Sequence, residues 1–185
     1  MSKYLRQILY DMRLFVGLVP SGESLLRIEG MIPMFLPPDS RRVPPSNLHL
    51  TLVFLVDYPE AEVDRLKQLL WQEVFEEGIP AFSLTPHRLR WQGGTLWLEL
   101  EKDPRLEAAA ERLHEVVGIP FRRPFRPHIT LARTRKKYSS VLGSYRLFMG
   151  KDSLFFPEAC LFQSHLRPTG AVYERLMRYP LRPLS

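Results

Sequence analysis

The 185-residue sequence has little cysteine and no long apolar run, and both absences narrow the class of protein. Its single cysteine, Cys160, excludes an internal disulfide and lies in an apolar run, so we interpret it as a buried small hydrophobic residue. No apolar run reaches the roughly 18–20 residues that span a bilayer. The first residues, Met1 to Gln7, lack the apolar segment and cleavage site of a signal peptide. We therefore expect a cytoplasmic protein without a membrane anchor.

Metal-binding patterns and low-complexity segments are also missing. No cluster of His, Cys or Asp shows ligand spacing, so we expect no metal and no other cofactor. The absence of a flexible linker predicts a single domain over residues 1–185. What the chain has in excess is positive charge, with a formal net charge of +6. Such a balance is compatible with a polyanionic partner but is not specific for one.

Two stretches in different halves of the chain share one pattern. Both read His-apolar-Thr-Leu, first from His49 and again from His128, and both lie in aliphatic runs that predict strands. Because side chains alternate across a strand, each histidine shares a face with the threonine two residues later, Thr51 or Thr130. The residues between them are then free to enter a core. One such motif is common in strands, but two copies in matching contexts indicate two histidines across a shared cleft.

Basic residues, mostly arginines, gather beside both motifs. They precede the first motif at 41–42, precede the second at 122–123 and at Arg126, and follow it at 133–137. Part of this charge is expected to be ordinary solvated loop charge. Its placement next to two titratable side chains nevertheless favours a polyanionic ligand.

Periodicity and turn residues predict an alternation of strands and helices. Besides the two motif runs, the predicted strands cover 13–20, 82–85, 89–91, 95–100, 153–166 and 171–179, and the predicted helices cover 22–29 (capped by Ser21), 59–77, 104–117 and 138–148. A strand–helix–motif order early in the chain and a hairpin–helix–motif order later form a loose duplication. We therefore predict an α+β fold of two lobes, each an antiparallel sheet with helices packed on one side.

The paired motifs resemble the signature of the two-histidine (2H) phosphoesterase superfamily, and the chain looks most like its RNA 2′,3′-cyclic phosphodiesterases, historically called 2′-5′ RNA ligases. The resemblance extends over nearly the whole chain. It includes the runs 13–20, 43–48, 125–133 and 161–166, with Gly170 and Tyr173. It implies a bilobal, pseudo-twofold domain of two intertwined lobes, with the active-site cleft between them.

The resemblance also implies a role for each motif residue when water opens a cyclic phosphodiester. His49 would be the proton donor to the leaving 3′ oxygen, and His128 the proton acceptor that activates water, which gives a 2′-phosphomonoester. Thr51 and Thr130 would bind phosphate oxygens, and Arg133 would add a further phosphate contact. These residue types suit the reaction. An imidazole titrates near pH ~6.5 and serves as acid or base, while hydroxyls and a guanidinium stabilise phosphate charge.

Strand alternation bears on the rest of the cleft. It places Arg133 on the face opposite to His128, so this arginine helps only if the strand bends or ends there. It places Phe54 on the core face, which predicts packing rather than contact with a nucleobase. The sequence also departs from the family, with Val56 where glycine is usual and Arg42 where an aromatic residue is usual. Both departures concern loop shape and the grip on the nucleoside rather than the His-x-Thr pairs.

The other three histidines are expected to lie outside the chemistry or at its edge. His114 is predicted on a helix and His87 in a proline-flanked loop, and we interpret both as surface or structural residues. His165 lies on a family-like strand, which would bring it near the cleft.

The leading hypothesis is an RNA 2′,3′-cyclic phosphodiesterase that has reverse 2′-5′ RNA ligation as a secondary activity. We expect it to act as a monomer on RNA or nucleotides that end in a cyclic phosphate. The enzymatic alternative is another phosphodiester substrate, either ADP-ribose cyclic phosphate or a 2′-5′ oligonucleotide. The alternative from another class is a non-catalytic module that binds RNA ends, although binding alone needs no pair of titratable groups.

Overall fold

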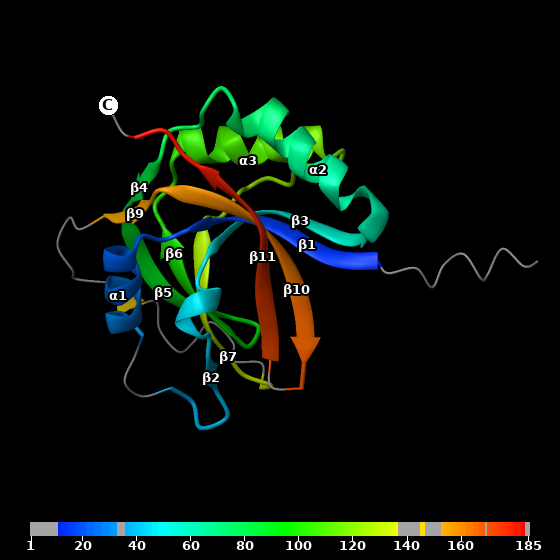
Figure 1. The fold of residues 1–185 in the computed structure, drawn as a ribbon. Coiled ribbons are helices and arrows are strands. Elements are labelled where there is room, and N and C mark those ends of the chain that lie inside the picture. The colour runs from blue at the N-terminus through cyan, green and yellow to red at the C-terminus, as the bar shows by residue number, and fades with distance from the viewer. Residues whose placement is uncertain (1–10, 33–35, 137–144, 147–152, 169, 184–185) are drawn as a thin grey trace, which may run out of the picture.

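The computed structural model describes residues 11–32, 36–136, 145–146, 153–168 and 170–183 (Figure 1). Its strands are β1 (Asp11–Val19), β2 (Arg41–Arg42), β3 (Leu50–Pro59), β4 (Phe82–Leu84), β5 (Pro86–Gln92), β6 (Thr95–Leu100), β7 (His128–Arg133), β8 (Tyr145–Arg146), β9 (Leu154–Phe156), β10 (Glu158–Arg167) and β11 (Gly170–Pro180). Its α-helices are α1 (Gly22–Gly30), α2 (Val63–Leu70) and α3 (Pro104–Val116), with 3₁₀ turns at Pro45–Asn47 and Glu60–Glu62 and a π-helical turn at Trp71–Phe75. This is the predicted α+β class.

One antiparallel sheet carries most of the described chain. Its strands run in the order β11-β10-β1-β3-β7-β6-β5-β8, and β2 pairs with β7 (Figure 1). The order divides into two halves at the contact between β3 and β7, which is the antiparallel pair Leu50↔Ile129. The two predicted lobes are therefore halves of one continuous sheet, and the residue between the histidine and the threonine of each motif forms the seam.

A β-bulge follows the threonine of each motif strand. In β3 the pairing with β1 shifts by one residue after Thr51, and residues 52 and 53 are both buried. In β7 the pairing with β6 shifts after Thr130, and residues 131 and 132 are both buried. Each bulge inserts one residue into its strand, so the alternation of side chains is reversed beyond it.

The bulges turn two side chains toward the face from which the motif histidines project, which we call the histidine face. Arg133 lies beyond the bulge in β7 and so shares this face with His128. Phe54 lies beyond the bulge in β3, is 57% exposed, and has its ring centroid 5.6 Å from that of Phe15. The prediction that Phe54 packs in the core was wrong, because simple alternation takes no account of an inserted residue.

Helices α2 and α3 lie next to each other against the opposite side of the sheet (Figure 1). Leu66 of α2 and Leu106 of α3 belong to the same hydrophobic core as Leu50 and Ile129 at the seam. Burying these apolar side chains supplies the main favourable contribution to folding. The helices therefore support the motif strands from behind, and the histidines project from the other face.

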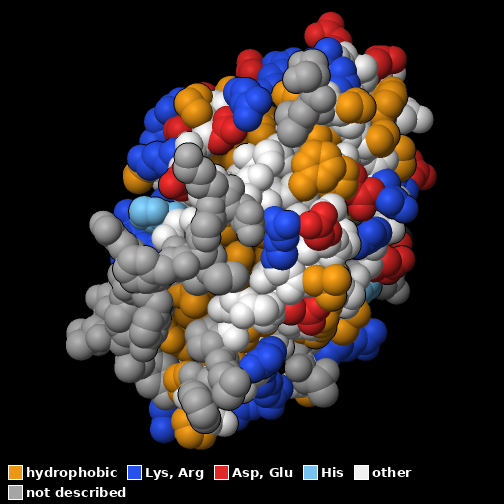
Figure 2. Space-filling view, turned by 90° about the vertical axis from the view of Figure 1, so that its left-hand side faces the viewer, with side chains coloured by type: hydrophobic (Ala, Val, Ile, Leu, Met, Phe, Trp, Pro, Cys, Tyr) orange, Lys and Arg blue, Asp and Glu red, His pale blue; other side chains and the backbone are white. Residues whose placement is uncertain are grey.

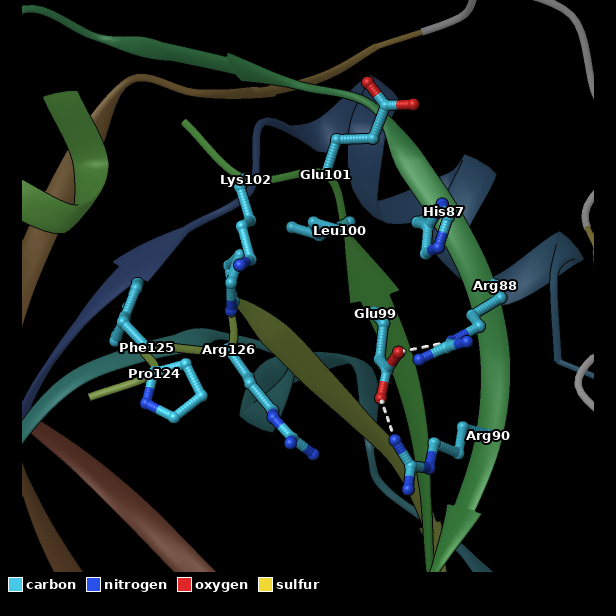
Figure 3. A pocket seen from close by; sticks show the side chains of 11 residues that line it. His87, Arg88, Arg90, Glu99, Leu100, Glu101, Lys102, Pro124, Phe125 and Arg126 are labelled. Carbon is cyan, nitrogen blue, oxygen red and sulfur yellow. Dashed lines mark hydrogen bonds and ion pairs between the residues drawn. The ribbon is translucent and has the colours of Figure 1, made fainter. Parts of the chain in front are cut away.

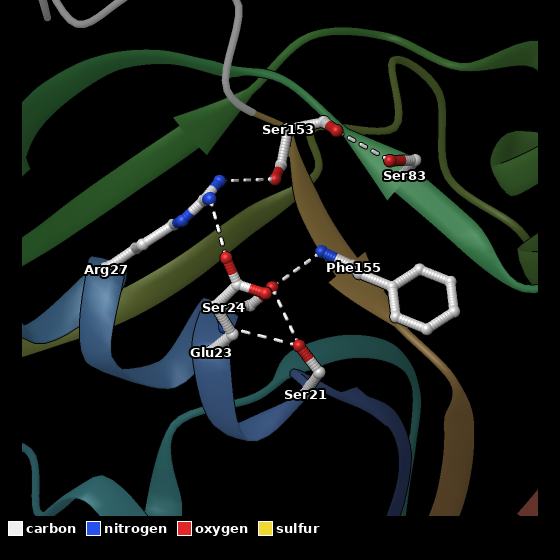
Figure 4. Close-up of polar contacts among 7 residues, drawn as sticks. All are labelled: Ser21, Glu23, Ser24, Arg27, Ser83, Ser153 and Phe155. Carbon is white, nitrogen blue, oxygen red and sulfur yellow. Dashed lines mark hydrogen bonds and ion pairs between the residues drawn. The ribbon is translucent and has the colours of Figure 1, made fainter.

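Hydroxyl contacts fix the start of α1 against β9 (Figure 4). Ser21, the predicted N-cap, accepts a hydrogen bond from the Ser24 amide at 3.2 Å. The buried Ser24 hydroxyl in turn accepts a hydrogen bond from the Phe155 amide at 2.7 Å, and Arg27 donates to the Ser153 carbonyl. The N-cap prediction is confirmed, and these contacts fix the helix beside β9.

Two other secondary-structure predictions need correction. The helix expected over 59–77 begins only at Val63, because a 3₁₀ turn precedes it, and it ends in the π-helical turn. The runs 82–85 and 89–91 do not continue one another. β4 pairs with β9 in a separate two-stranded sheet, whereas β5 joins the main sheet.

Position 87 and the run 138–148 also differ from expectation. His87 lies within β5 rather than in a loop, because the strand begins at Pro86. The helix predicted over 138–148 falls largely outside the described residues, and Tyr145–Arg146 form β8 instead of helix. No helix within the described ranges is both long enough and apolar enough to cross a membrane.

Candidate active site

The seam between β3 and β7 brings the two motifs together. Because Leu50 pairs with Ile129 in antiparallel register, His49 lies across from Thr130 and Thr51 lies across from His128. The two imidazoles and two hydroxyls thus occupy neighbouring positions on the histidine face, and all four residues are partly buried.

Both histidines are held by the same kind of contact. The Nδ1–H of His49 donates to the carbonyl of Asn47 at 2.6 Å, and the Nδ1–H of His128 donates to the carbonyl of Arg126 at 2.8 Å. A carbonyl only accepts hydrogen bonds, so the contact assigns the proton to Nδ1 and leaves the lone pair of each neutral ring on Nε2. The Nε2 atom of His49 lies 3.1 Å from the hydroxyl oxygen of Thr51. In each motif, Nε2 is therefore the atom available for proton exchange.

Further contacts fix the position of the His49 ring. Asn47 is 8% exposed, and its Nδ2 donates to the carbonyl of Ala171 in β11 at 2.8 Å. On the neighbouring strand, a Cβ atom at Gly17 would lie 3.0 Å from the carbonyl oxygen of Leu50 and 3.2 Å from Cδ2 of His49. A larger residue at position 17 would therefore displace the motif backbone or the ring.

An aromatic cluster surrounds His49. The ring centroid of Phe15 lies 4.6 Å from that of His49, Tyr173 meets it edge-on at 5.2 Å, and Phe162 lies at 5.8 Å. The buried Cys160 belongs to the same cluster, and burial raises the pKa of its thiol to about 11. The prediction of a buried cysteine is confirmed, and a thiol with this pKa is a poor nucleophile at neutral pH.

The surroundings lower the pKa of both histidines. Burial lowers the pKa of His49 from 6.5 to about 4. The Asn47 carbonyl acts in the opposite direction, and the charges of His128 and Arg133 add to the lowering. Burial also lowers the pKa of His128, against the Arg126 carbonyl and the Glu99 carboxylate, which raise it. Both rings are therefore neutral at pH 7 in the unliganded protein.

The surroundings of His128 are different in kind. The indole of Trp97 stacks on its ring at a centroid distance of 3.9 Å and an interplanar angle of 25°. Glu99, on the same strand, is in register with both His128 and Arg88. Glu99 is 7% exposed, and its carboxylate accepts hydrogen bonds from Arg88 at 2.5 Å and from Arg90 at 3.4 Å. His128 therefore lies against an indole and beside a buried carboxylate.

Sequence analysis did not identify Trp97 and Glu99 as parts of the site. The signal for them is their spacing, because residues 97 and 99 share one face of a strand. This spacing points to the site only once it is known that β6 pairs with β7.

Arg133 lies near both histidines, since its charge lowers the pKa of each. It also lines a cavity of about 710 Å³, which we call the Arg133 cavity. Asn47 and Tyr173 connect this cavity to His49, and Arg41, Arg42, Arg135 and Arg167 contribute further guanidinium groups. Figure 2 shows basic side chains at the lower end of the molecule, where Figure 1 places β2 and the turn between β10 and β11. The Arg133 cavity is thus suited to an anionic ligand.

The remaining histidines make structural or surface contacts. His87 is exposed on β5. The Nδ1–H of His114 donates to the carbonyl of Ile119 just beyond α3, and His165 pairs with Glu174 at 3.0 Å. Among the described residues, no group of three or more His, Cys, Asp or Glu side chains is placed to hold a metal ion.

Comparisons with known proteins identify the family and similar folds. The family model described as the 2′-5′ RNA ligase superfamily matches residues 25–146. An RNA 2′,3′-cyclic phosphodiesterase of Thermus thermophilus is 34% identical over 162 residues, which are 76% of this chain and 75% of that protein. One from Archaeoglobus fulgidus is 28% identical over 147 residues, 74% of this chain and 81% of that protein. The crystal structure of E. coli LigT complexed with 3′-AMP has a TM-score of 0.73 at 27% identity, and the match covers 92% of this chain and 98% of that one.

Proposed function

Because the chain belongs to the 2′-5′ RNA ligase superfamily, we propose that it opens the 2′,3′-cyclic phosphate at RNA ends to a 2′-phosphomonoester. The observation that carries this proposal is the pair of histidines, each anchored through Nδ1 to a carbonyl, beside Thr51 and Thr130 on one face. Hydrolysis of a cyclic phosphodiester needs one group that takes a proton and one that gives a proton. Two imidazoles provide both without a metal.

The proposed reaction assigns one proton transfer to each histidine. Nε2 of His128 accepts a proton from water while the water oxygen forms a bond to phosphorus. The bond between phosphorus and the 3′ oxygen breaks, and protonated His49 donates its Nε2 proton to that oxygen. The products are a 2′-phosphomonoester and a free 3′-hydroxyl, and exchange with solvent restores both rings.

Thr51, Thr130 and Arg133 are proposed to stabilise the transition state. Negative charge spreads over the non-bridging phosphate oxygens as the phosphoryl group is transferred. The two hydroxyls donate hydrogen bonds to these oxygens, and the guanidinium adds a fixed positive charge. The proximity of Arg133 to both histidines supports its place in this set.

His49 must carry a proton before it acts as an acid. Its pKa of about 4 means that it is neutral at pH 7 in the free protein. A bound phosphate anion within about 4–6 Å favours the charged form of an imidazole and so raises its pKa. We therefore infer that His49 gains its proton as the substrate binds, and that its low intrinsic pKa makes it a strong proton donor.

The nucleoside is proposed to lie on the His49 side, where aromatic side chains provide a surface for a base. Phe54 is exposed on the histidine face beside Phe15, and Tyr173 lines the Arg133 cavity. Stacking of a base on an aromatic ring contributes about 1–3 kcal/mol. RNA is thus the proposed partner, and the cytoplasm is the location that this substrate favours.

One chain supplies the whole site, because β3 and β7 of one sheet carry the motifs and the anchoring carbonyls belong to residues just before these strands. We propose that it acts as a monomer and that residues 1–185 form one domain. The same residues also support 2′-5′ ligation, in which a 5′-hydroxyl takes the place of the attacking water while His128 remains the base and His49 the acid.

The test is to incubate the protein, in EDTA, with a nucleoside 2′,3′-cyclic phosphate and to identify the product. We expect a 2′-monophosphate, and the variants His49→Ala and His128→Ala should each lower the rate by about 10²–10⁴-fold. His87→Ala, an exposed histidine on β5, is the matched control and should retain the wild-type rate. A 3′-monophosphate would reverse the acid and base assignments, and near-normal rates in both motif variants would refute the mechanism.

The alternative functions make different predictions in the same assay. ADP-ribose cyclic phosphate or a 2′-5′ oligonucleotide would be turned over faster than an RNA end if either were the preferred substrate. A non-catalytic module would bind the nucleotide without turnover, and binding would survive His128→Ala.

A further inference from the structure

A second cavity, of about 480 Å³, lies beside His128. It is lined by His87, Arg88, Arg90, Glu99, Lys102 and Arg126, with Leu100, Glu101, Pro124, Phe125 and Pro127 completing the wall. Strand β7 runs from His128 to Arg133, and this cavity adjoins its first residue while the Arg133 cavity adjoins its last. The two cavities therefore lie at opposite ends of β7.

Its chemistry fits a nucleic acid strand. In Figure 3, Arg88 and Arg90 line one side from β5, Arg126 lines the other, and Glu99 lies between them. Glu99 neutralises part of the charge of Arg88 and Arg90. Within the described part of the chain, the exposed Lys102 and Arg126 side chains make no ion pair. Free cations beside an apolar wall suit a phosphate backbone with its bases.

The role of this second cavity rests on the proposed function. In phosphoryl transfer the attacking oxygen and the leaving oxygen lie roughly in line on opposite sides of phosphorus. His49 serves the leaving 3′ oxygen, so the nucleoside with the cyclic phosphate lies toward His49 and the Arg133 cavity. His128 serves the attacking oxygen, so the second cavity lies on the side from which the nucleophile arrives.

We propose that the second cavity binds the RNA strand whose 5′-hydroxyl attacks the cyclic phosphate in 2′-5′ ligation, and we call it the acceptor cavity. The 5′ oxygen forms a bond to phosphorus and gives its proton to Nε2 of His128. The bond from phosphorus to the 3′ oxygen breaks, and that oxygen takes the proton of His49. The product is a 2′-5′ phosphodiester, and no other reactant is needed. Hydrolysis replaces the strand with water and leaves the acceptor cavity empty.

Lys102 offers the cleanest test, because it belongs to no other part of the site. The variant Lys102→Glu should raise the KM for a 5′-hydroxyl oligonucleotide in ligation by about tenfold or more, the cost of roughly 1.4 kcal/mol. The salt dependence of that KM should weaken in Lys102→Ala, with a slope lower by about 0.7 for the single lost phosphate contact. Hydrolysis of a cyclic-phosphate oligonucleotide and of a cyclic mononucleotide should keep the wild-type rate in both variants.

Two controls isolate the acceptor cavity. Lys67→Glu makes the same charge change on α2, at the opposite side of the sheet, and should leave ligation unchanged. Arg41→Glu, in the Arg133 cavity, should impair hydrolysis of the cyclic-phosphate oligonucleotide more than hydrolysis of the mononucleotide. Lys102→Glu would then impair ligation and spare hydrolysis, whereas Arg41→Glu would impair hydrolysis of the oligonucleotide, so the two variants would distinguish the two cavities.

Three outcomes would overturn the proposal. If Lys102→Glu impairs hydrolysis of the cyclic-phosphate oligonucleotide and spares the mononucleotide, the cavity holds the other strand. If ligation is unchanged in Lys102→Glu, the cavity binds neither. If the wild-type protein hydrolyses a cyclic phosphate but neither joins RNA ends nor cleaves a 2′-5′ linkage, there is no acceptor site although the proposed function stands. Failure of the wild-type protein to hydrolyse any cyclic phosphate would instead refute the proposed function itself.

Discussion

Acid should destabilise the folded protein through the buried ring of His49. The pKa of this imidazole falls from 6.5 to about 4 on folding, because burial disfavours its charged form. A group whose pKa is lowered by folding contributes stability above its unfolded pKa, and that stability is lost as the pH falls through the folded pKa. At about 1.36 kcal/mol per unit, the loss attributable to His49 is about 2 kcal/mol at pH 5 and about 3 kcal/mol at pH 4.

The assay is urea unfolding, followed by tryptophan fluorescence, at pH 7, 5 and 4. Carboxylates that titrate in this range act equally in every variant, so the comparison is between the wild-type protein, His49→Gln and the exposed control His87→Gln. We expect the free energy of unfolding of His49→Gln to fall by about 2 kcal/mol less than that of the wild-type protein between pH 7 and pH 5. An equal fall in His49→Gln and His87→Gln would refute the argument that burial of the ring controls this transition.

Three further predictions concern catalysis. If the bound phosphate raises the pKa of His49, the alkaline decline of kcat should lie at higher pH than the decline of kcat/KM; coincident declines would contradict this. Gly17→Ala should lower kcat about tenfold while the far-ultraviolet dichroism spectrum stays native, since its Cβ would lie 3.2 Å from the His49 ring; an unchanged kcat would show that the ring tolerates the shift. Trp97→Ala should lower kcat about tenfold and move the acidic limb of the kcat profile, whereas Trp97→Phe should restore both because the phenyl ring still covers His128; a change in KM alone would assign Trp97 to substrate binding.

The sequence motifs predicted that the two histidines and two threonines share one face because the information in the motifs is local. In a strand, the histidine and the threonine of a His-x-Thr motif lie on the same face, and the second copy of the motif repeats this arrangement in a second strand. The anchoring contact is local as well, since each histidine donates to the carbonyl two residues earlier, at Asn47 or Arg126. Expectations that depend only on neighbouring residues therefore agree with the structure at both histidines.

For residues beyond a bulge, the expectation from strand alternation was wrong for Phe54 and stayed conditional for Arg133. Alternation from His49 places Phe54 in the core, and alternation from His128 turns Arg133 away. One inserted residue in each strand reverses both results. A bulge is defined by the register of the neighbouring strand, so a single strand read alone cannot reveal it. Trp97 and Glu99 were missed for a related reason, because the pairing of β6 with β7 joins segments some thirty residues apart.

The difference between the surroundings of two similar motifs also bears on which histidine is the acid. His49 lies among Phe15, Phe162 and Tyr173, which provide no charge to stabilise an imidazolium, so a proton taken up there is readily given to a leaving oxygen. His128 lies beside Glu99, and in the proposed mechanism the carboxylate stabilises the imidazolium that forms when the ring removes a proton from water. Arg88 and Arg90 hold this carboxylate in place through ion pairs. Glu99→Gln should therefore weaken the base more than the acid, and should move the acidic limb of the kcat profile, which reports the substrate complex, to lower pH. A shift of the alkaline limb instead would show that His128, which lies beside Glu99, is the acid, and the two roles would be reversed.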